Sequence, residues 1–360
     1  MKRLSAVLTF VAVPLVITGC DITENQPLES SSAVGIQAQQ EVAAHHWNAE
    51  VSAELLLSFD EAGGQLPEGI AIDKTGNIFV SIAPLGQVWK IRNGSDTPEV
   101  FGTIAGIDAS AGDVGVLGLA TDAPGNVYAG VQSSNADANG VWVLDRRSGE
   151  ATRIEGSENI AFANDVAFDK EGNLYITDSV LGAIWRLPKH GELEPWLTGD
   201  ENLAGTGVLG LGAPVGANGI EYRQGTLFVA NTEKGLVVAV PVGPDGSPGV
   251  SSIVAAFPEI EVQPGVFLPS AADGLALDVF GNIYVAQINL STIVKVATNG
   301  DVSVVFSGDP LDWPSSIKFG TSRAHQKTLF AVNFSIGEGF GDAEPRVGPG
   351  LVALDLGVPG

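Results

Sequence analysis

Three kinds of residue are scarce in this sequence, and each scarcity excludes a class of protein. A single cysteine among 360 residues rules out an intramolecular disulfide framework and cysteine-rich zinc or iron–sulfur sites. Basic residues are few: 18 Lys and Arg stand against 42 Asp and Glu, a net charge of −24. Phosphate backbones repel such an acidic chain, so no nucleic-acid partner is expected. Beyond residue 17, no apolar run is long enough to span a membrane.

The N-terminal segment has the form of an export signal. A basic start precedes an apolar run over residues 4–17, which is shorter than the roughly 20 residues of a membrane-spanning helix. The run ends in ITGC, which resembles the bacterial lipobox and makes Cys20 the lipidated residue; a plain secretory signal with a free cysteine is the alternative. We expect a protein of the bacterial cell envelope that faces the periplasm or exterior and touches the membrane only through its lipid. The expected segments are a lipoprotein signal peptide at 1–19, the lipidated cysteine and a flexible tether at 20–50, and a folded domain at 51–360.

Glycine and proline are plentiful, at 46 and 20 residues, which favours many strands and turns over long helices. One sequence pattern recurs six times: a short apolar strand, usually an Asp and a Gly-Asn turn, then a strand with an aromatic residue. Further strands follow each copy, giving about four per unit of roughly 40–50 residues, which is typical of a β-propeller blade. We predict an all-β, six-bladed β-propeller with four antiparallel strands per blade. The copies are residues 67–81, 117–130, 164–177, 218–230, 273–286 and 315–332.

The ends of the chain predict how the ring closes. The sixth repeat ends at residues 350–357 and has no fourth strand after it. Residues 53–60 form a strand-like segment before the first repeat, with no partner of their own. Because a propeller must protect its strand edges, we predict that this N-terminal strand forms the outer strand of the last blade.

Loop lengths predict which face of the propeller carries the site. The turns between first and second strands, and between third and fourth, are short. The long segments all connect second to third strands or one blade to the next, and these open on a single face. Long loops on one rim of a rigid scaffold commonly build binding sites. They are residues 105–116, 131–140, 199–217, 258–272 and 335–349.

The residue that opens each innermost strand should point from that face into the central channel. Four of the six carry oxygen ligands, although neither Asp nor Asn favours strands. Two carboxylates around a narrow axis repel each other unless a cation lies between them. This oxygen set predicts one divalent ion, Ca²⁺ in preference to Mg²⁺, Mn²⁺ or Zn²⁺; the alternative is that the side chains cap turns around a water-filled channel. The six residues are Glu68, Leu117, Asn164, Asn218, Asp273 and Ser315.

These motifs carry a family resemblance. The repeats, with Pro67-Glu68-Gly69, Asn164-Asp165, Asn218-Gly219 and Asp273-Gly274 in this order, resemble the SMP-30/gluconolactonase/LRE-like propellers over about residues 53–357. The resemblance implies a metal-dependent hydrolase of lactones or related esters, with a small-molecule substrate. It places the ion on Glu68, Asn218 and Asp273, with Asn164 lining the same site, and we assign catalytic roles to Asp273 and Asn164. We expect a monomer.

Two departures from the family pattern bear on the substrate. Gluconolactonases typically have Arg-Phe-Asn-Asp-Gly in the third blade, whereas this chain has FANDV at residues 162–166, so the sugar-binding arginine is missing. The rim segment 199–217 is rich in glycine and apolar residues. Both features favour a less polar substrate than an aldonolactone.

Further candidates lie around the proposed ion. Asp165 is a candidate for a second ion deeper in the channel, as the resemblance to paraoxonase-like propellers implies. The ends of the second strands supply second-layer candidates, with hydrogen bonding at the rim as the alternative interpretation; these are Asp178, Asn231, Gln287 and Asn333. His45 and His46 lie in the tether, and His190 and His325 lie in turns of the other face, so a Ser-His-Asp hydrolase is excluded.

Two rival functions remain on the sequence alone. One is a non-enzymatic, NHL-like envelope propeller that binds a protein or a glycan. The other is a strictosidine-synthase-like propeller, which shares the fold but uses no catalytic metal. The fold cannot choose among these because propellers host many functions. A bound ion would.

Overall fold

The computed structural model describes residues 51–263, 265–336 and 347–360. The predicted signal peptide, Cys20 and the tether lie outside these residues. In the part of the chain that is described, every helix is too short or too polar to cross a membrane.

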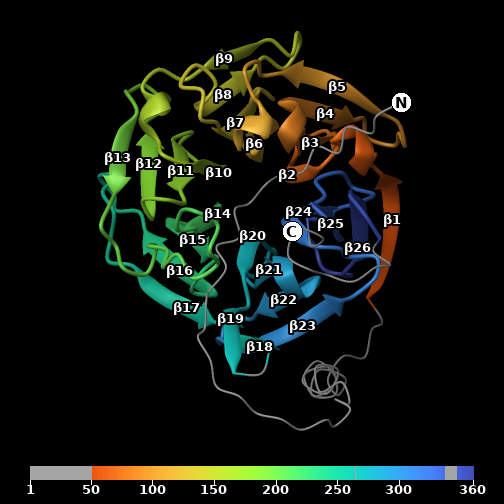
Figure 1. The fold of residues 1–360 in the computed structure, drawn as a ribbon, viewed down its shortest axis with the longest axis vertical. Coiled ribbons are helices and arrows are strands. Elements are labelled where there is room, and N and C mark those ends of the chain that lie inside the picture. Colours follow the sequence, from red (N-terminus) through yellow and green to blue (C-terminus); the bar gives the residue numbers. More distant parts are fainter. Residues whose placement is uncertain (1–50, 264, 337–346) are drawn as a thin grey trace, which may run out of the picture.

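Six four-stranded antiparallel sheets surround a central axis (Figure 1), so the predicted six-bladed β-propeller is confirmed. Each blade runs from an innermost strand at the axis to an outer strand at the rim. Blades one to three are β2 (Pro67–Ile72), β3 (Ile78–Ile82), β4 (Gln87–Ile91) and β5 (Pro98–Thr103); β6 (Gly115–Thr121), β7 (Val127–Gln132), β8 (Gly140–Leu144) and β9 (Ala151–Arg153); β10 (Ala163–Phe168), β11 (Leu174–Asp178), β12 (Ala183–Leu187) and β13 (Glu194–Leu197).

The remaining blades repeat the arrangement, and short 3-10 helices lie in the loops. Blades four to six are β14 (Ala217–Arg223), β15 (Thr226–Asn231), β16 (Leu236–Pro241) and β17 (Ser252–Ala256); β20 (Ala272–Leu277), β21 (Ile283–Gln287), β22 (Thr292–Val296) and β23 (Val302–Ser307); β24 (Pro314–Phe319), β25 (Thr328–Asn333), β26 (Gly350–Asp355) and β1 (Ser52–Ser58). The 3-10 helices are η1 (Glu61–Gly63), η2 (Ala83–Leu85), η3 (Ala109–Ala111), η4 (Ser157–Asn159) and η5 (Ile288–Leu290).

The first strand of the described residues closes the ring, as predicted. β1 pairs antiparallel with β26, from Ser52 opposite Asp355 to Ser58 opposite Gly350. In Figure 1 it lies beside the C-terminal strands of the sixth blade. The predicted range of 53–60 runs two residues beyond the strand, because the chain turns inward there and buries Phe59 against Trp89 of the first blade, with ring centroids 5.8 Å apart. The last blade therefore combines both ends of the described chain.

Apolar side chains fill the space between neighbouring blades. Each of the six interfaces has its own buried cluster; between the third and fourth blades, for example, Tyr175 and Ile184 pack against Ile220 and Val229. The side chains alternate along each strand, so that one set packs toward the preceding blade and the other toward the following one. These interfaces make the propeller a rigid ring around its axis.

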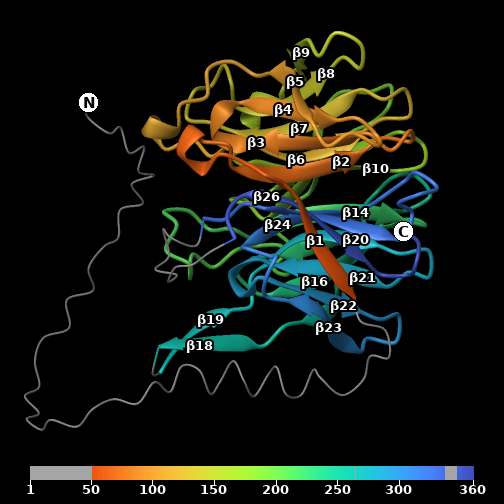
Figure 2. The ribbon, with the colours of Figure 1, turned by 90° about the vertical axis from the view of Figure 1, so that its right-hand side faces the viewer.

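The two faces of the ring differ in how their loops are built. We call the face where the innermost strands begin the mouth face; it lies to the left in Figure 2. On the opposite face, four blades share a clasp around the tight turn between the first and second strands. The carboxylate of an Asp accepts hydrogen bonds from backbone N–H groups of the turn and from the side chain of the Asn that ends the turn. The Asn Nδ2 to Asp Oδ2 distances are 2.8 Å for Asn77–Asp73 and Asn126–Asp122, and 2.6 Å for Asn173–Asp169 and Asn282–Asp278. The Asp and Gly-Asn of the sequence repeats are therefore structural.

The long segment 258–272 contains secondary structure that its length alone did not predict. A separate hairpin of β18 (Glu259–Gln263) and β19 (Val266–Pro269) stands there, between blades four and five, and projects from the mouth face (Figure 2). The sequence alternates polar and apolar residues before a Pro-Gly pair, which is a hairpin signal. Its tip exposes Val262 and Phe267, at 42% and 51%.

Candidate functional site

A backbone irregularity sets the side chains at the channel mouth. In all six innermost strands the pairing register shifts near the start of the strand, between Pro67 and Ile70 in β2 and between Ala272 and Leu275 in β20, for example. Such a bulge leaves residues unpaired and re-aims their side chains. Glu68, Asn164, Asn218 and Asp273 all occupy these bulges.

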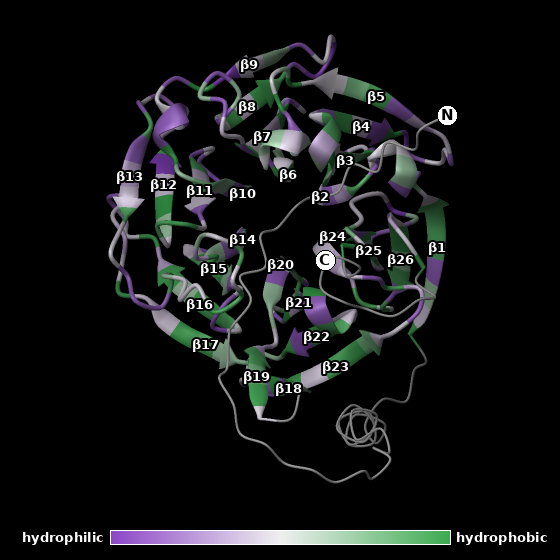
Figure 3. Ribbon diagram, in the orientation of Figure 1, coloured by the Kyte–Doolittle hydropathy of each residue, from purple (hydrophilic) through white to green (hydrophobic). Residues whose placement is uncertain are grey.

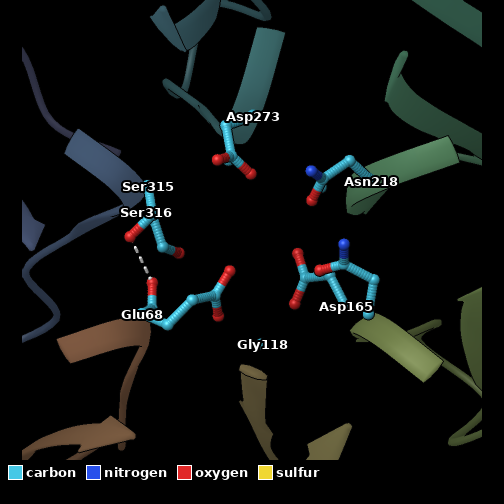
Figure 4. A pocket seen from close by; sticks show the side chains of 10 residues that line it. Glu68, Gly118, Asp165, Asn218, Asp273, Ser315 and Ser316 are labelled. Carbon is cyan, nitrogen blue, oxygen red and sulfur yellow. Dashed lines mark hydrogen bonds between the residues drawn. The ribbon is translucent and has the colours of Figure 1, made fainter. Parts of the chain in front are cut away.

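The four side chains surround one small cavity on the axis. All six innermost strands line it, and its volume of about 10 Å³ matches a single water molecule or ion. Glu68, Asn218, Asp273 and Asp165 converge on it in Figure 4. The complete lining is Glu68, Gly118, Asn164, Asp165, Asn218, Gly219, Asp273, Gly274, Ser315 and Ser316.

Glycines of the innermost strands let the blades meet at the axis. A Cβ atom on Gly69 would lie 2.3 Å from the carbonyl oxygen of Leu117, and one on Gly219 would lie 2.5 Å from that of Asp273. Leu117 itself is buried and does not line the cavity. Ser315 lines it, but its hydroxyl donates to the carbonyl oxygen of Glu68 at 2.7 Å and so joins the sixth blade to the first (Figure 4).

Three carboxylates line the cavity, and two of them, Glu68 and Asp273, are the predicted ion ligands. Glu68 and Asp273 are 7% and 6% exposed, and Oε2 of Glu68 is buried with no hydrogen-bond partner. Burial, then the charges of Asp273 and Asp165, raises the pKa of Glu68 well above its usual range. Burial, then the charge of Asp165, raises that of Asp273, against a hydrogen bond from Asn218 that lowers it. A buried carboxylate oxygen without a donor is costly unless a cation compensates it.

The carboxamides complete an oxygen-rich set. Asn164 and Asn218 are 5% and 6% exposed. Their Nδ2 atoms donate outward, to the hydroxyls of Ser179 and Thr232, each at 2.9 Å. No three Asp, Glu, His or Cys side chains of the described residues are grouped closely enough to hold a metal ion without other ligands. An ion on this axis would therefore use amide oxygens besides the two carboxylates, and such a hard oxygen set fits Ca²⁺ or Mg²⁺.

Asp165 lies in a different environment from Glu68 and Asp273. Its carboxylate accepts N–H bonds from Ile220 at 3.0 Å and from Val166 at 2.8 Å. Burial raises its pKa to about 6, against the lowering effect of the Lys318 ammonium and of those N–H groups. Lys318 also forms an ion pair with Glu221. Asp165 thus already has a cationic group near it, which leaves Glu68 and Asp273 as the carboxylates for a single ion.

The four predicted second-layer residues do not line the cavity; three of them fasten loops of the mouth face. Asp178 accepts from the N–H groups of residues 161 and 162, at 2.9 and 3.2 Å. Asn231 donates to the carbonyl oxygens of residues 202 and 204, and Asn333 donates to that of residue 310. Gln287 is buried at the end of β21, where its backbone pairs with Ala272.

Sequence reasoning missed several residues that shape the mouth. Buried Glu233 accepts from the backbone N–H groups of Thr206 and Gly207, at 2.5 and 2.6 Å, and so holds the glycine-rich rim segment. Asp113 and Asp312 fasten their own loops in the same manner. Ser179 and Thr232, which hold the site amides, also went unnoticed. Ser179 and Thr232 directly follow Asp178 and Asn231, two of the predicted second-layer residues. Their position in the repeat was therefore the signal that could have identified them.

The charge of the cavity predicts an inverted pH response in the ion-free protein. Because burial raises the pKa of Glu68, Asp165 and Asp273 above unfolded values near 4, the folded state holds more protons than the unfolded state above that pH. With a chelator, stability should therefore fall as pH rises from about 4 through 6 and beyond. The melting temperature should drop by several degrees, and Ca²⁺ should flatten the curve. Identical curves with chelator and with Ca²⁺ would contradict an ion at these carboxylates.

Solved structures supply the comparison with known proteins. A luciferin-regenerating enzyme superposes with a TM-score of 0.63 at 16% identity, over 86% of this chain and 97% of the other. This chain has the fold of that enzyme. A gluconolactonase from Xanthomonas campestris gives 0.60 at 18% identity, over 86% and 91% of the two chains. Regucalcin from Agrobacterium tumefaciens, a calcium-binding protein, gives 0.62 at 15% identity, over 86% and 94%.

These neighbours confirm the predicted structural resemblance to six-bladed propellers of the SMP-30 type. No protein-family model matches the sequence, and none of the curated proteins matches it significantly. At such low identities the likeness shows the fold alone. The function must be argued from the cavity.

Proposed function

We propose that this chain is a metal-dependent hydrolase of lactones or related esters. The observation that carries the proposal is the buried, unpartnered Oε2 of Glu68, which lies beside Asp273 and two carboxamides in a cavity of ionic size. The supporting resemblance is to gluconolactonase- and regucalcin-like propellers. Glu68, Asn164, Asn218 and Asp273 would hold the ion, with Ca²⁺ favoured.

The residues of the cavity divide the chemistry among them. When bound, the ion supplies a Lewis acid that polarises a carbonyl group and stabilises negative charge on its oxygen. Glu68 sets the charge of the site, and Asn164 and Asn218 add oxygen ligands without charge. Asp273 would either take a proton from the water molecule that attacks the carbonyl carbon, as general base, or attack that carbon itself as direct nucleophile.

The surroundings of the mouth favour an apolar substrate. Leu85, Leu181 and Val208 lie in mouth-face loops and are 37%, 56% and 49% exposed. Strand β19 of the neighbouring hairpin is hydrophobic (Figure 3) and exposes Phe267. Since the family's sugar-binding arginine is also missing, we propose lactones or esters with apolar substituents in preference to aldonolactones.

Two measurements test the function. Elemental analysis of the purified full chain, before and after chelation, should find one divalent ion per chain. A panel of lactones and aryl esters should be hydrolysed, with activity lost on chelation and restored by Ca²⁺. A protein with no bound ion, no thermal response to Ca²⁺ or Mg²⁺ and no hydrolysis would remove the enzyme proposal. A binding propeller for a protein or glycan would then be favoured.

We also propose that a lipid on Cys20 holds the domain in the cell envelope. Strand β1 begins at Ser52, whose partner Asp355 ends a third strand on the face opposite the mouth, so residue 51 joins the propeller on that opposite face. Cys20→Ser should release the protein into the soluble envelope fraction or leave its signal uncleaved, with the fold intact by circular dichroism. Fractionation that finds the variant tightly membrane-bound and normally processed would contradict the anchor.

A further inference from the structure

Two hydroxyl groups behind the cavity form two short chains of hydrogen bonds with the proposed ligands, and the backbone joins one chain to the next. Asn164 donates to Ser179, and Ser179 donates to the carbonyl oxygen of Ala217 at 2.6 Å. The next residue, Asn218, donates to Thr232, which donates to the carbonyl oxygen of Ala272 at 2.8 Å. Residue 272 directly precedes Asp273. The relay, as we call Ser179 and Thr232 with these bonds, thus crosses from blade three to four and from four to five.

Counting protons fixes the direction of each bond. A carbonyl oxygen can only accept, so the single proton of each hydroxyl is directed to the carbonyl of Ala217 or Ala272. The hydroxyl oxygen must then accept from the Asn side chain, and only Nδ2 can donate. The relay residues are 0% and 5% exposed, which limits exchange with water.

The orientation of the amides matters because the two ends of a carboxamide have opposite polarity. One Nδ2 proton of each amide is held by the relay, and the second Nδ2 proton of Asn218 is directed to the Asp273 carboxylate. Oδ1 of Asn164 and of Asn218 is then the acceptor left for a cation in the cavity. A flipped amide would present N–H groups to the site, and these would repel a cation. Nothing about Asn itself prevents the flip, since its two ends are nearly the same size.

We propose that Ser179 and Thr232 are positioning residues that lock both carboxamides with their oxygens toward the ion. The inference deepens the proposed function and rests on it. Partners that orient a ligand from behind commonly change metal affinity by about 10- to 100-fold when they are removed. Each relay bond also ends on the peptide group that precedes the next ligand, so the backbone of Asn218 and Asp273 is held by the same hydroxyls.

The test is Ca²⁺ affinity, measured by titration calorimetry on the chelator-stripped full chain. Ser179→Ala and Thr232→Val remove the hydroxyls and should each weaken Ca²⁺ binding by about 10- to 100-fold. Thr232→Ser keeps a hydroxyl and should restore the affinity to within a few-fold. Thr177→Val is the matched control, because Thr177 is a buried hydroxyl of the same blade that contacts only backbone groups, among them the carbonyl oxygen of Asn218 at 2.7 Å.

The outcomes separate this inference from the function on which it rests. Weakened binding in both relay variants, rescue by Thr232→Ser and near wild-type affinity in Thr177→Val would support positioning. Wild-type affinity in Ser179→Ala and Thr232→Val would overturn the relay alone and leave the hydrolase standing. Equal weakening of Ca²⁺ binding in Ser179→Ala, Thr232→Val and Thr177→Val would show that these hydroxyls have only a structural role, and it would also overturn the relay. A wild type that binds no divalent ion would overturn both proposals.

Discussion

Asp273→Asn should remove most Ca²⁺ binding and lower lactone or ester hydrolysis by about 10²- to 10⁴-fold, the usual contribution of a general base. The substitution keeps the size of the side chain but deletes one of the two proposed ligand charges. Ca²⁺ at 100 times its dissociation constant should stabilise the wild type by about 2.7 kcal/mol, because it binds only the folded state. The variant should lose most of this gain, measured as the shift in melting temperature.

The same substitution should have the opposite effect on the ion-free protein. Burial and neighbouring charge raise the pKa of Glu68 and Asp273, so their ionised forms destabilise the folded state when no cation is present. At pH 8 in chelator, Asp273→Asn should therefore melt higher than the wild type. A lower melting temperature there would show that Asp273 makes a favourable contact independent of any ion.

The matched control lies five residues along the chain. Asp278 follows the same strand, β20, at its other end and accepts from the Asn282 side chain at 2.6 Å. Asp278→Asn breaks a structural clasp, so it should lower the melting temperature with and without Ca²⁺ and leave the Ca²⁺ affinity unchanged. Equal losses of affinity in Asp273→Asn and Asp278→Asn would mean that the ion is held elsewhere or that the fold is at fault.

The sequence predicted the blades and the ring closure because both follow from periodic local signals. The Asp, Gly-Asn and aromatic residues recur at each turn, and the unpaired strand at residues 53–60 could be matched to a blade that lacked one. The same register placed Glu68, Asn164, Asn218 and Asp273 at one end of the innermost strands. Their convergence in one cavity required the bulges, which the repeat pattern does not reveal.

The contacts between blades could not be predicted, because they join residues far apart in sequence without a repeated pattern. Lys318 of blade six pairs with Glu221 of blade four and lies near Asp165 of blade three. Ser179 and Thr232 depend in the same way on the carbonyl oxygens of the next blade, at Ala217 and Ala272. From the sequence, Glu233 resembles any exposed charged residue of a loop. In the structure it is buried and accepts hydrogen bonds from two backbone N–H groups of the rim segment.

Deletion of residues 51–60 should have the largest effect on folding. β1 is the outer strand of the sixth blade, and the deleted segment packs on both sides of that blade. Leu55 joins the cluster with blade five, and Leu57 and the following Phe59 join the cluster with blade one. Buried side chains of this kind contribute roughly 1.5–3 kcal/mol each, so the loss should lower the melting temperature by roughly 10 °C or more. Removal of β1 also exposes the edge of β26 to pairing with other chains, so we expect aggregation.

Deletion of residues 21–45 is the comparison that isolates the role of β1. This deletion removes more residues than the deletion of 51–60, but all of them belong to the predicted tether, and every described strand stays in place. We expect the melting temperature to stay within about 1 °C of the wild type, because no packed side chain or ladder hydrogen bond of the described propeller is lost. Light scattering and thermal melts of the two deletion variants measure the difference. Equal destabilisation would mean that the ring does not depend on β1, and the closure of blade six would then have to come from other contacts.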